Sequence, residues 1–284
     1  MSFFNTYKEN SPLSDLALER RRVNPDTPGV EYKRERGSFG VWERIKIRSP
    51  KGAAEIGRPM GIYDTLTLPK INTLDYEGID DAVNEIAAEL CRLCDSLDIM
   101  PETVLVVGLG NPALTPDAVG AMCAEAVEPT LHIYELDENM FNSLECSKIA
   151  VIAPGVSAKT GMDTSVIVKG VCDRLHPDVI FAVDSIASRS PSRLGTTVQI
   201  SDTGILPGSC LGKNKGSLDA DTLGAPVIAI GVPTVIDTRF LCGEVEGQSD
   251  YTSLFVCPKD INEIVEKSAK IIAGGINQAF GLCF

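Results

Sequence analysis

Short, nearly all-apolar runs that alternate with amphipathic stretches constrain the fold of this chain most strongly. The runs are VLVVGL (104–109), IAVIA (149–153), VIFAVD (179–184) and VIAIGV (227–232). Strands buried on both faces of a parallel sheet have this composition, and the crossovers that join them are usually helices. We therefore predict an α/β fold with a doubly wound, mainly parallel sheet and helices on both faces.

Helices are predicted between these strands by apolar side chains that recur every three or four residues. The clearest helix covers 79–97, and others are predicted from Pro116, near 164–175 and from about 259 to 279. Further strands are predicted at 39–47, 63–68, 131–136 and 198–200. Residues 1 to about 38 are polar, and we expect them to be irregular. No repeat or linker divides the remainder, which predicts one domain.

Composition excludes several classes of partner. With 284 residues, of which 44% are hydrophobic, the chain can bury an ample core without disulfides. Its nine cysteines are odd in number and scattered, which is typical of reduced thiols in an intracellular protein. A net charge of −13 disfavours direct binding to nucleic acid. No apolar run approaches the roughly 20 residues that span a bilayer, so we expect no membrane partner.

A glycine pattern raises the possibility of a dinucleotide site. Gly108-x-Gly110-x-x-Ala113 follows a predicted strand, and Glu135 ends the next one, where a ribose-binding acid would lie. Pro112 and Pro116 disfavour this interpretation, because the helix that holds the pyrophosphate should already have begun there. The pattern instead predicts Thr115 as N-cap and Pro116 as the first helical residue. A dinucleotide-binding oxidoreductase is kept as the weaker alternative.

Two aspartates form a stronger candidate site. Asp117 is the second residue of the predicted helix, where the helix dipole favours its charge and a capping role is the ordinary one. Asp184 ends a predicted strand, and ligands of doubly wound sheets bind beyond the carboxyl ends of the strands. Two carboxylates that meet there cannot easily both ionise, so one keeps its proton near neutral pH. Such a pair can perform acid–base chemistry on a water molecule.

Other chemical groups are less promising. Asp202-Thr203-Gly204 spells the active-site triplet of pepsin-like proteases, but those enzymes are β-rich, so we expect a polar turn at the rim of the crevice. His132 and His176 are expected to be structural, and Cys91-x-x-Cys94 lacks the second pair that a zinc site needs. We expect neither a metal nor a cofactor.

Five segments in order together resemble the germination protease family of spore-forming bacteria. They are VVGLGNPALTPDAVG (106–120), APGVSAKTGMDTS (153–165), VDSIASRS (183–190), TTVQISDTGILPGS (196–209) and VIAIGVPTVID (227–237), and the resemblance runs in register over about 11–279. It implies an endopeptidase of atypical aspartic type that degrades small acid-soluble spore proteins at germination. It also implies a homotetramer in the cytoplasm of the forespore or spore core.

The family's two proposed catalytic aspartates fall on Asp117 and Asp184 in this sequence. The implied fold is similar to that of hydrogenase-maturation proteases, which hold a metal with acids and a histidine. No matching histidine is present here, so a mechanism without metal is expected. Ser188, Arg189 and Asp202 are candidates for binding substrate or orienting Asp184, although a turn role suits Ser188 and Arg189 equally well.

The resemblance also implies a zymogen. Residues 1–15 form a propeptide-like leader, and 16–284 form a single α/β peptidase domain. Within LSDLALE (13–19), an acidic residue beside an apolar one imitates a cleavage site, so we hypothesise self-processing near Ser14, Asp15 and Leu16. The connection between Asp237 and Cys257 is shorter than expected for the family, which leaves open a catalytically inactive or regulatory protein of the same fold.

Overall fold

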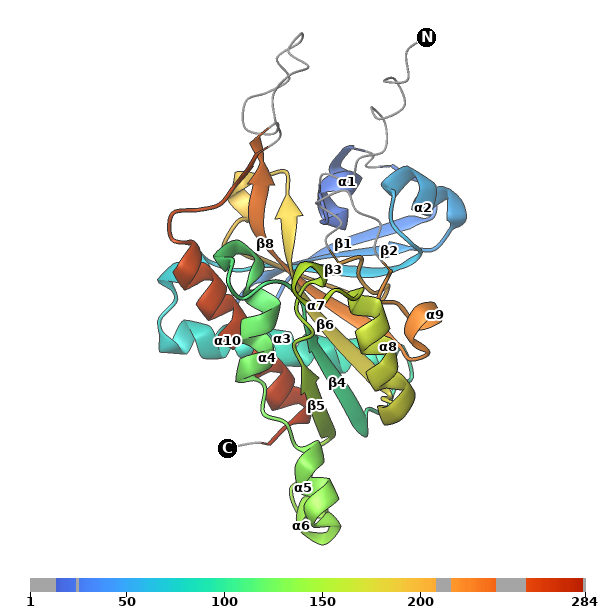
Figure 1. Ribbon diagram of the computed structural model, residues 1–284. Helices are drawn as coiled ribbons and strands as arrows, with labels where there is room; N and C mark the ends of the chain where they lie inside the picture. Colours follow the sequence, from blue (N-terminus) through green and yellow to red (C-terminus); the bar gives the residue numbers. More distant parts are fainter. Residues whose placement is uncertain (1–13, 24–25, 208–215, 239–253, 283–284) are drawn as a thin grey trace.

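The computed structural model describes residues 14–23, 26–207, 216–238 and 254–282, whose strands form one sheet (Figure 1). The sheet has nine strands in the order β1-β2-β3-β7-β8-β6-β4-β5, with β9 paired to β8. The strands are β1 (Val30–Arg36), β2 (Val41–Ile47), β3 (Gly61–Thr67), β4 (Thr103–Gly108), β5 (Lys148–Ile152), β6 (Val179–Ser188), β7 (Thr197–Ser201), β8 (Val227–Asp237) and β9 (Phe255–Val256).

The predicted α/β class is confirmed, with an antiparallel extension that the sequence did not reveal. Strands β5, β4, β6 and β8 are parallel to one another. Strands β7, β3, β2 and β1 continue the sheet with antiparallel pairings. The β1–β2 pair is a hairpin closed by a hydrogen bond from the N–H of Gly37 to the carbonyl of Gly40 (2.9 Å), and such short connections require antiparallel neighbours.

Helices cover both faces of the parallel strands, as predicted (Figure 1). Val104 and Val106 of β4 pack in one cluster with residues of α3, α4 and α10, whereas Leu105 and Val107 pack in a second cluster with residues of α8. Both faces of β4 are therefore buried, which explains its unbroken apolar run. The helices are α1 (Ala17–Val23), α2 (Pro50–Ile56), α3 (Tyr76–Ser96), α4 (Val119–Ala126), α5 (Leu131–Leu136), α6 (Glu138–Asn142), α7 (Ser157–Thr160), α8 (Thr164–Leu175), α9 (Ala220–Leu223) and α10 (Ile261–Phe280). No helix of the described ranges has the length and apolarity needed to cross a membrane.

The strand predicted at 131–136 is wrong, because this run is the short helix α5. None of its residues is buried, and Leu136 is 83% exposed. The ring of Tyr134 instead packs edge-on against Phe141 of α6. A short apolar run is compatible with either structure, and here the sheet ends at β5. Helices α5 and α6 project from the lower end of the sheet in Figure 1, where the parallel strands begin.

The irregular structure predicted for residues 1 to about 38 is also wrong for two parts of the described chain. Residues 17–23 form α1, and 30–36 form the edge strand β1. Ala17 and Leu18 are buried with Ile45 and Ile56, in a cluster between α1, α2 and the sheet. Tertiary contacts therefore order a segment whose polar composition alone predicts disorder. Residues 1–13 of the predicted leader lie outside the described residues.

Candidate functional site

Asp184 lies within β6 rather than at its end, since the strand continues to Ser188. Its side chain is only 6% exposed, and its Oδ1 accepts a hydrogen bond from the N–H of Ser185 at 2.9 Å. Burial raises the pKa of this carboxyl well above its ordinary value, and the charge of Asp117 raises it further. The charge of Asp15 acts in the same direction. Asp184 is thus a buried acid that favours its protonated form.

Asp117 is not held as predicted. Residues 115–117 form a separate 3₁₀ turn, and α4 begins only at Val119, so Asp117 precedes the helix instead of occupying its first turn. Its Oδ2 accepts the N–H of Asn111 at 2.9 Å. Gly110 adopts φ +99°, and a Cβ there would lie 2.0 Å from the carbonyl oxygen of Asp117. The glycine therefore allows the turn after β4 to wrap around the aspartate.

The structure brings Asp117 and Asp184 to one cavity of about 200 Å³. The segments that carry them are joined by a hydrogen bond from the N–H of Val119 to the Oγ of Ser185 (3.3 Å). Apolar side chains, among them Leu114 and Phe255, supply much of the remaining wall. The two acids therefore share a partly desolvated space, as the sequence led us to expect.

A second cavity of about 330 Å³ also reaches Asp184, and Asp184 and Ser185 line both. Its wall is more polar and includes Arg58, Tyr63 and Gln199. Asp15 lines it as well, so the N-terminal segment enters this cavity. Asp184 consequently lies between a more apolar cavity shared with Asp117 and a more polar cavity whose wall includes Asp15 of the chain's own N-terminal region.

The docking segment, defined as residues 14–19, is bound to β6 and β7 through its backbone. The N–H of Asp15 donates to the carbonyl of Ala187 at 3.0 Å, and the N–H of Ala187 donates to the Oδ2 of Asp15 at 3.0 Å. Gln199 of β7 accepts the N–H of Ala17 (2.9 Å) and donates to the carbonyl of Asp15 (3.2 Å). Leu16 is fully buried. The docking segment therefore covers the region of β6 that follows Asp184.

Ser188 and Arg189 bind the docking segment. The Oγ of Ser188 donates to Oε1 of Glu19 at 2.6 Å, and the N–H of Arg189 donates to Oε2 at 2.8 Å. The N–H of Ser190 adds a third hydrogen bond at 3.1 Å, and the hydroxyl of Ser14 also donates to this carboxylate. Glu19 is 8% exposed, so its charge depends on these donors.

Asp202 belongs to the rim of the polar cavity without lining it. Its Oδ1 accepts the N–H of Ile62 at 2.7 Å, which ties the loop after β7 to β3. The next residues, Thr203 and Gly204, do line the cavity, and Gly204 has φ +73°. This agrees with the predicted polar turn at the crevice.

The glycines of the Gly108-x-Gly110-x-x-Ala113 pattern serve packing instead of phosphate binding. A Cβ at Gly108 would lie 2.2 Å from the carbonyl oxygen of Gly120, so α4 rests directly on β4. Glu135, the candidate ribose-binding acid, lies on α5 rather than at a strand end. That helix is at the end of the sheet where the parallel strands begin, opposite Asp184. The site that a dinucleotide needs is therefore not formed.

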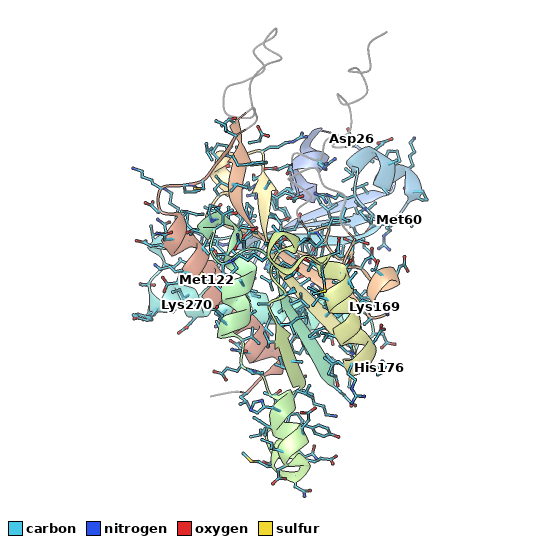
Figure 2. The ribbon with its side chains drawn as sticks, viewed as in Figure 1. Asp26, Met60, Met122, Lys169, His176 and Lys270 are labelled. Atoms are coloured by element: carbon cyan, nitrogen blue, oxygen red, sulfur yellow. The ribbon has the colours of Figure 1, made fainter. Side chains whose placement is uncertain are left out.

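The residues present also do not fit a metal site like that of the hydrogenase-maturation proteases. Among the described residues, no three His, Cys, Asp or Glu side chains are grouped so that they could hold a metal ion. His132 is on α5, and His176 caps the C-terminal end of α8. Figure 2 shows His176 far from α1, the helix that carries part of the docking segment. Burial raises the pKa of Cys94 to about 12, which is typical of a structural thiol.

Two residues of the site were missed by sequence reasoning. Arg58 precedes β3 in a loop and carries no motif, so nothing local indicated its position. Gln199 did carry a signal, because it stands between Val198 and Ile200 in a strand whose residues are all buried. A polar side chain at such a position needs a partner, and here the partner is the docking segment.

Comparison with known proteins agrees with these observations. The family model described as germination protease matches residues 16–245. The germination protease of Caldanaerobacter subterraneus subsp. tengcongensis is 35% identical over 94% of this chain and 93% of its own. That of Bacillus subtilis is 40% identical over 79% of this chain and 63% of its own. A solved NiFe hydrogenase maturation protease, HycI from Thermococcus kodakarensis, aligns with a TM-score of 0.34 and 19% identity over 62% of this chain and 94% of that one. The chain therefore belongs to the germination protease family and is accordingly a protease.

Proposed function

We propose that this protease is an endopeptidase of atypical aspartic type in which Asp117 and Asp184 activate a water molecule. The observation that carries the proposal is the shared cavity, in which burial and the charge of Asp117 together raise the pKa of Asp184. Two such carboxyl groups hold one proton between them in the neutral range. One group can then act as base while the other acts as acid.

The surroundings of the two acids favour one starting assignment. Asp184, the more deeply buried acid, holds the proton and donates it toward the oxygen of the scissile carbonyl. Asp117, whose carboxylate accepts the N–H of Asn111, acts as the base and takes a proton from the attacking water. The water oxygen adds to the carbonyl carbon. Asp117 then gives its new proton to the amide nitrogen, the C–N bond breaks and the amine leaves, and Asp184 takes back the proton that it had given to the carbonyl oxygen. Neither step requires a metal or a cofactor.

The docking segment supports the proposal that the chain is a self-processing zymogen. Asp15 lines the polar cavity beside Asp184, and Leu16 follows it in the buried segment. An acidic residue followed by an apolar one thus lies next to the proposed catalytic pair. We propose that the chain cuts itself near Ser14, Asp15 and Leu16, and that its substrates are small acid-soluble spore proteins. Assembly as a homotetramer in the forespore or spore core is part of the same proposal.

Asparagine variants test the mechanism. Asp117→Asn and Asp184→Asn should each lower the rate of cleavage of a small acid-soluble spore protein by about 10²- to 10⁴-fold, the range for loss of a general acid or base. Asp173→Asn is the matched control, because Asp173 pairs with Lys169 on the surface of α8 and 61% of its side chain is exposed. Rates are followed at mildly acidic pH, and mass spectrometry identifies the new N-terminus of the full-length protein.

Three outcomes contradict specific parts of the proposal. Cleavage retained in either asparagine variant rejects the paired carboxylates, and strong inhibition by a chelator indicates a metal peptidase instead. An intact leader in fully active protein rejects self-processing. Absence of any cleavage by the wild-type chain would favour the inactive or regulatory protein.

A further inference from the structure

Resting on the proposed function, we infer that Arg58 is a specificity-determining residue that binds a carboxylate side chain of the substrate beside the proposed catalytic pair. The docked Asp15 shows the geometry. The Nη2 of Arg58 donates to the carbonyl of Ser14 at 2.9 Å and forms an ion pair with Oδ1 of Asp15 at 3.3 Å. One guanidinium group therefore contacts both the main chain and the acidic side chain of the bound peptide.

The peptide is held in one register, which assigns Arg58 to one of its positions. Asp15 is paired with Ala187 through two hydrogen bonds of 3.0 Å, and Gln199 holds the main chain on the other side. The N–H and carbonyl of Asp15 fix the position of the main chain, whatever side chain it carries. The carboxylate of Asp15 is shared, because its Oδ2 accepts the N–H of Ala187 and its Oδ1 pairs with Arg58.

Arg58 has unused hydrogen-bonding capacity in this cavity. Its side chain is 18% exposed, and its buried Nε has no hydrogen-bond acceptor among the described residues. A guanidinium group can bind a carboxylate through two parallel hydrogen bonds. A longer acidic side chain, as in glutamate, extends toward the Nε of Arg58. The cavity therefore suits either acid.

The positive charges around Arg58 favour binding of an anion in this cavity. Arg58 and Arg189 lie close enough to Arg20 that their positive charges, after burial, lower the pKa of Arg20. The charge of Asp15 opposes this effect. Removal of Asp15 with the leader would leave the partly buried guanidinium of Arg58 without this anionic partner. A partly desolvated charge without a partner is unfavourable, so a peptide that restores a carboxylate is favoured over one that does not.

Matched peptides test this assignment. Two internally quenched peptides carry the sequence of residues 13–19, one with Asp and one with Asn at the position of Asp15. Full-length wild-type protein, incubated until its leader is cut, should cleave the Asp peptide with a kcat/KM about 10- to 100-fold higher. Arg58→Gln should bring the ratio near 1 by losing activity on the Asp peptide alone. Arg48→Gln is the control, because Arg48 is 54% exposed and pairs with Glu31 on the surface.

The assignment is overturned if Arg58→Gln keeps the acid preference or if Arg48→Gln loses it to the same extent. Should Arg58→Gln fail to fold, Arg58→Lys replaces it. Lysine keeps the positive charge but lacks the planar guanidinium group with its several N–H donors. The ratio of kcat/KM for the Asp peptide to that for the Asn peptide should therefore fall at least threefold. An unchanged ratio in a folded Arg58→Lys protein also overturns the assignment.

A binding measurement separates failure of this inference from failure of the proposed catalysis. In uncut Asp184→Asn protein, Arg58→Gln and Asp15→Asn should each accelerate hydrogen exchange at the amides of residues 15–17 by about tenfold or more. The double variant should exchange little faster than either single one, because both remove the same contact. Unchanged exchange rejects the role of Arg58, whereas cleavage by Asp184→Asn rejects only the catalytic pair.

Discussion

Asp15 and Ala187 bind each other twice, since each backbone N–H donates to an oxygen of the other residue at 3.0 Å. Ala187 belongs to the strand that carries Asp184, so the N-terminal segment is fastened beside the proposed catalytic pair. Binding of the chain's own N-terminal segment to β6 supports the proposed zymogen and has consequences that can be measured.

Glu19→Gln should loosen the docking segment. The substitution removes a charge that is stabilised by hydrogen bonds from the Ser188 hydroxyl and from the N–H groups of Arg189 and Ser190. Hydrogen bonds to charged groups contribute about 1.5–3 kcal/mol each. In an Asp184→Asn background, trypsin should cut after Arg20 at least tenfold faster. Glu263→Gln, at an exposed position of α10, is the control. An equal trypsin rate in the Glu19→Gln and control proteins would show that this carboxylate does not secure the segment.

Asp117→Asn should lower the pKa of Asp184. Burial is the largest cause of the raised pKa and remains in the variant, whereas the contribution from the charge of Asp117 is lost. The pKa of Asp184 should therefore fall but stay above its ordinary value. Carbon-13 NMR of labelled aspartate carboxyl groups measures the change. A pKa that does not move would mean that the two carboxylates are too far apart to act as a pair.

Asp64→Asn should reduce the pH dependence of stability between pH 5 and pH 8. Burial and the neighbouring Glu89 raise the pKa of Asp64 to about 7, although Arg44 and Arg92 oppose the shift. A raised folded-state pKa stabilises the protein below the unfolded value of about 3.9, and this stability is lost as pH rises through 7. Glu89 has a lowered pKa, so its own contribution changes below this window.

The wild-type melting temperature should consequently fall more steeply from pH 5 to pH 8 than that of Asp64→Asn, as measured by calorimetry. Asp173→Asn, with 61% of the side chain exposed, should behave like the wild type. Parallel curves for wild type and Asp64→Asn would contradict the raised pKa, whatever the absolute stability of the variant.

Gly120→Ala should destabilise the protein by about 1–3 kcal/mol through overpacking. A Cβ at this position would lie 2.2 Å from the carbonyl oxygen of Val183 and would push α4 away from β6. Gly170→Ala is the opposite case, because a Cβ at this exposed position of α8 meets nothing within 4 Å. It should stabilise the protein by about 0.5–1 kcal/mol. Equal effects in urea denaturation would contradict the close helix–strand contact.

Most helices and strands could be predicted from the sequence because their signals are local. The apolar runs of β4, β6 and β8 reflect burial on both faces, and the spacing in α3 and α10 reflects one buried face. The approach of Asp117 to Asp184 was also predictable, since Asp117 follows β4 and Asp184 lies in the second half of β6, toward the carboxyl ends of neighbouring parallel strands. These features depend on residues that are close in sequence or on a general rule of topology.

Tertiary structure decided what local patterns leave open. The run 131–136 became a helix because the sheet ends at β5, and Asp117 precedes α4 because its carboxylate turns back to Asn111. Arg58 meets Asp15 across 43 positions of the chain, and Gln199 meets it across 184. Contacts between residues so far apart in the sequence produce no periodic pattern, because the folded sheet alone brings the partners together. The amino-acid pattern thus determined the layers and the acidic pair, whereas the fold determined what occupies the site beside them.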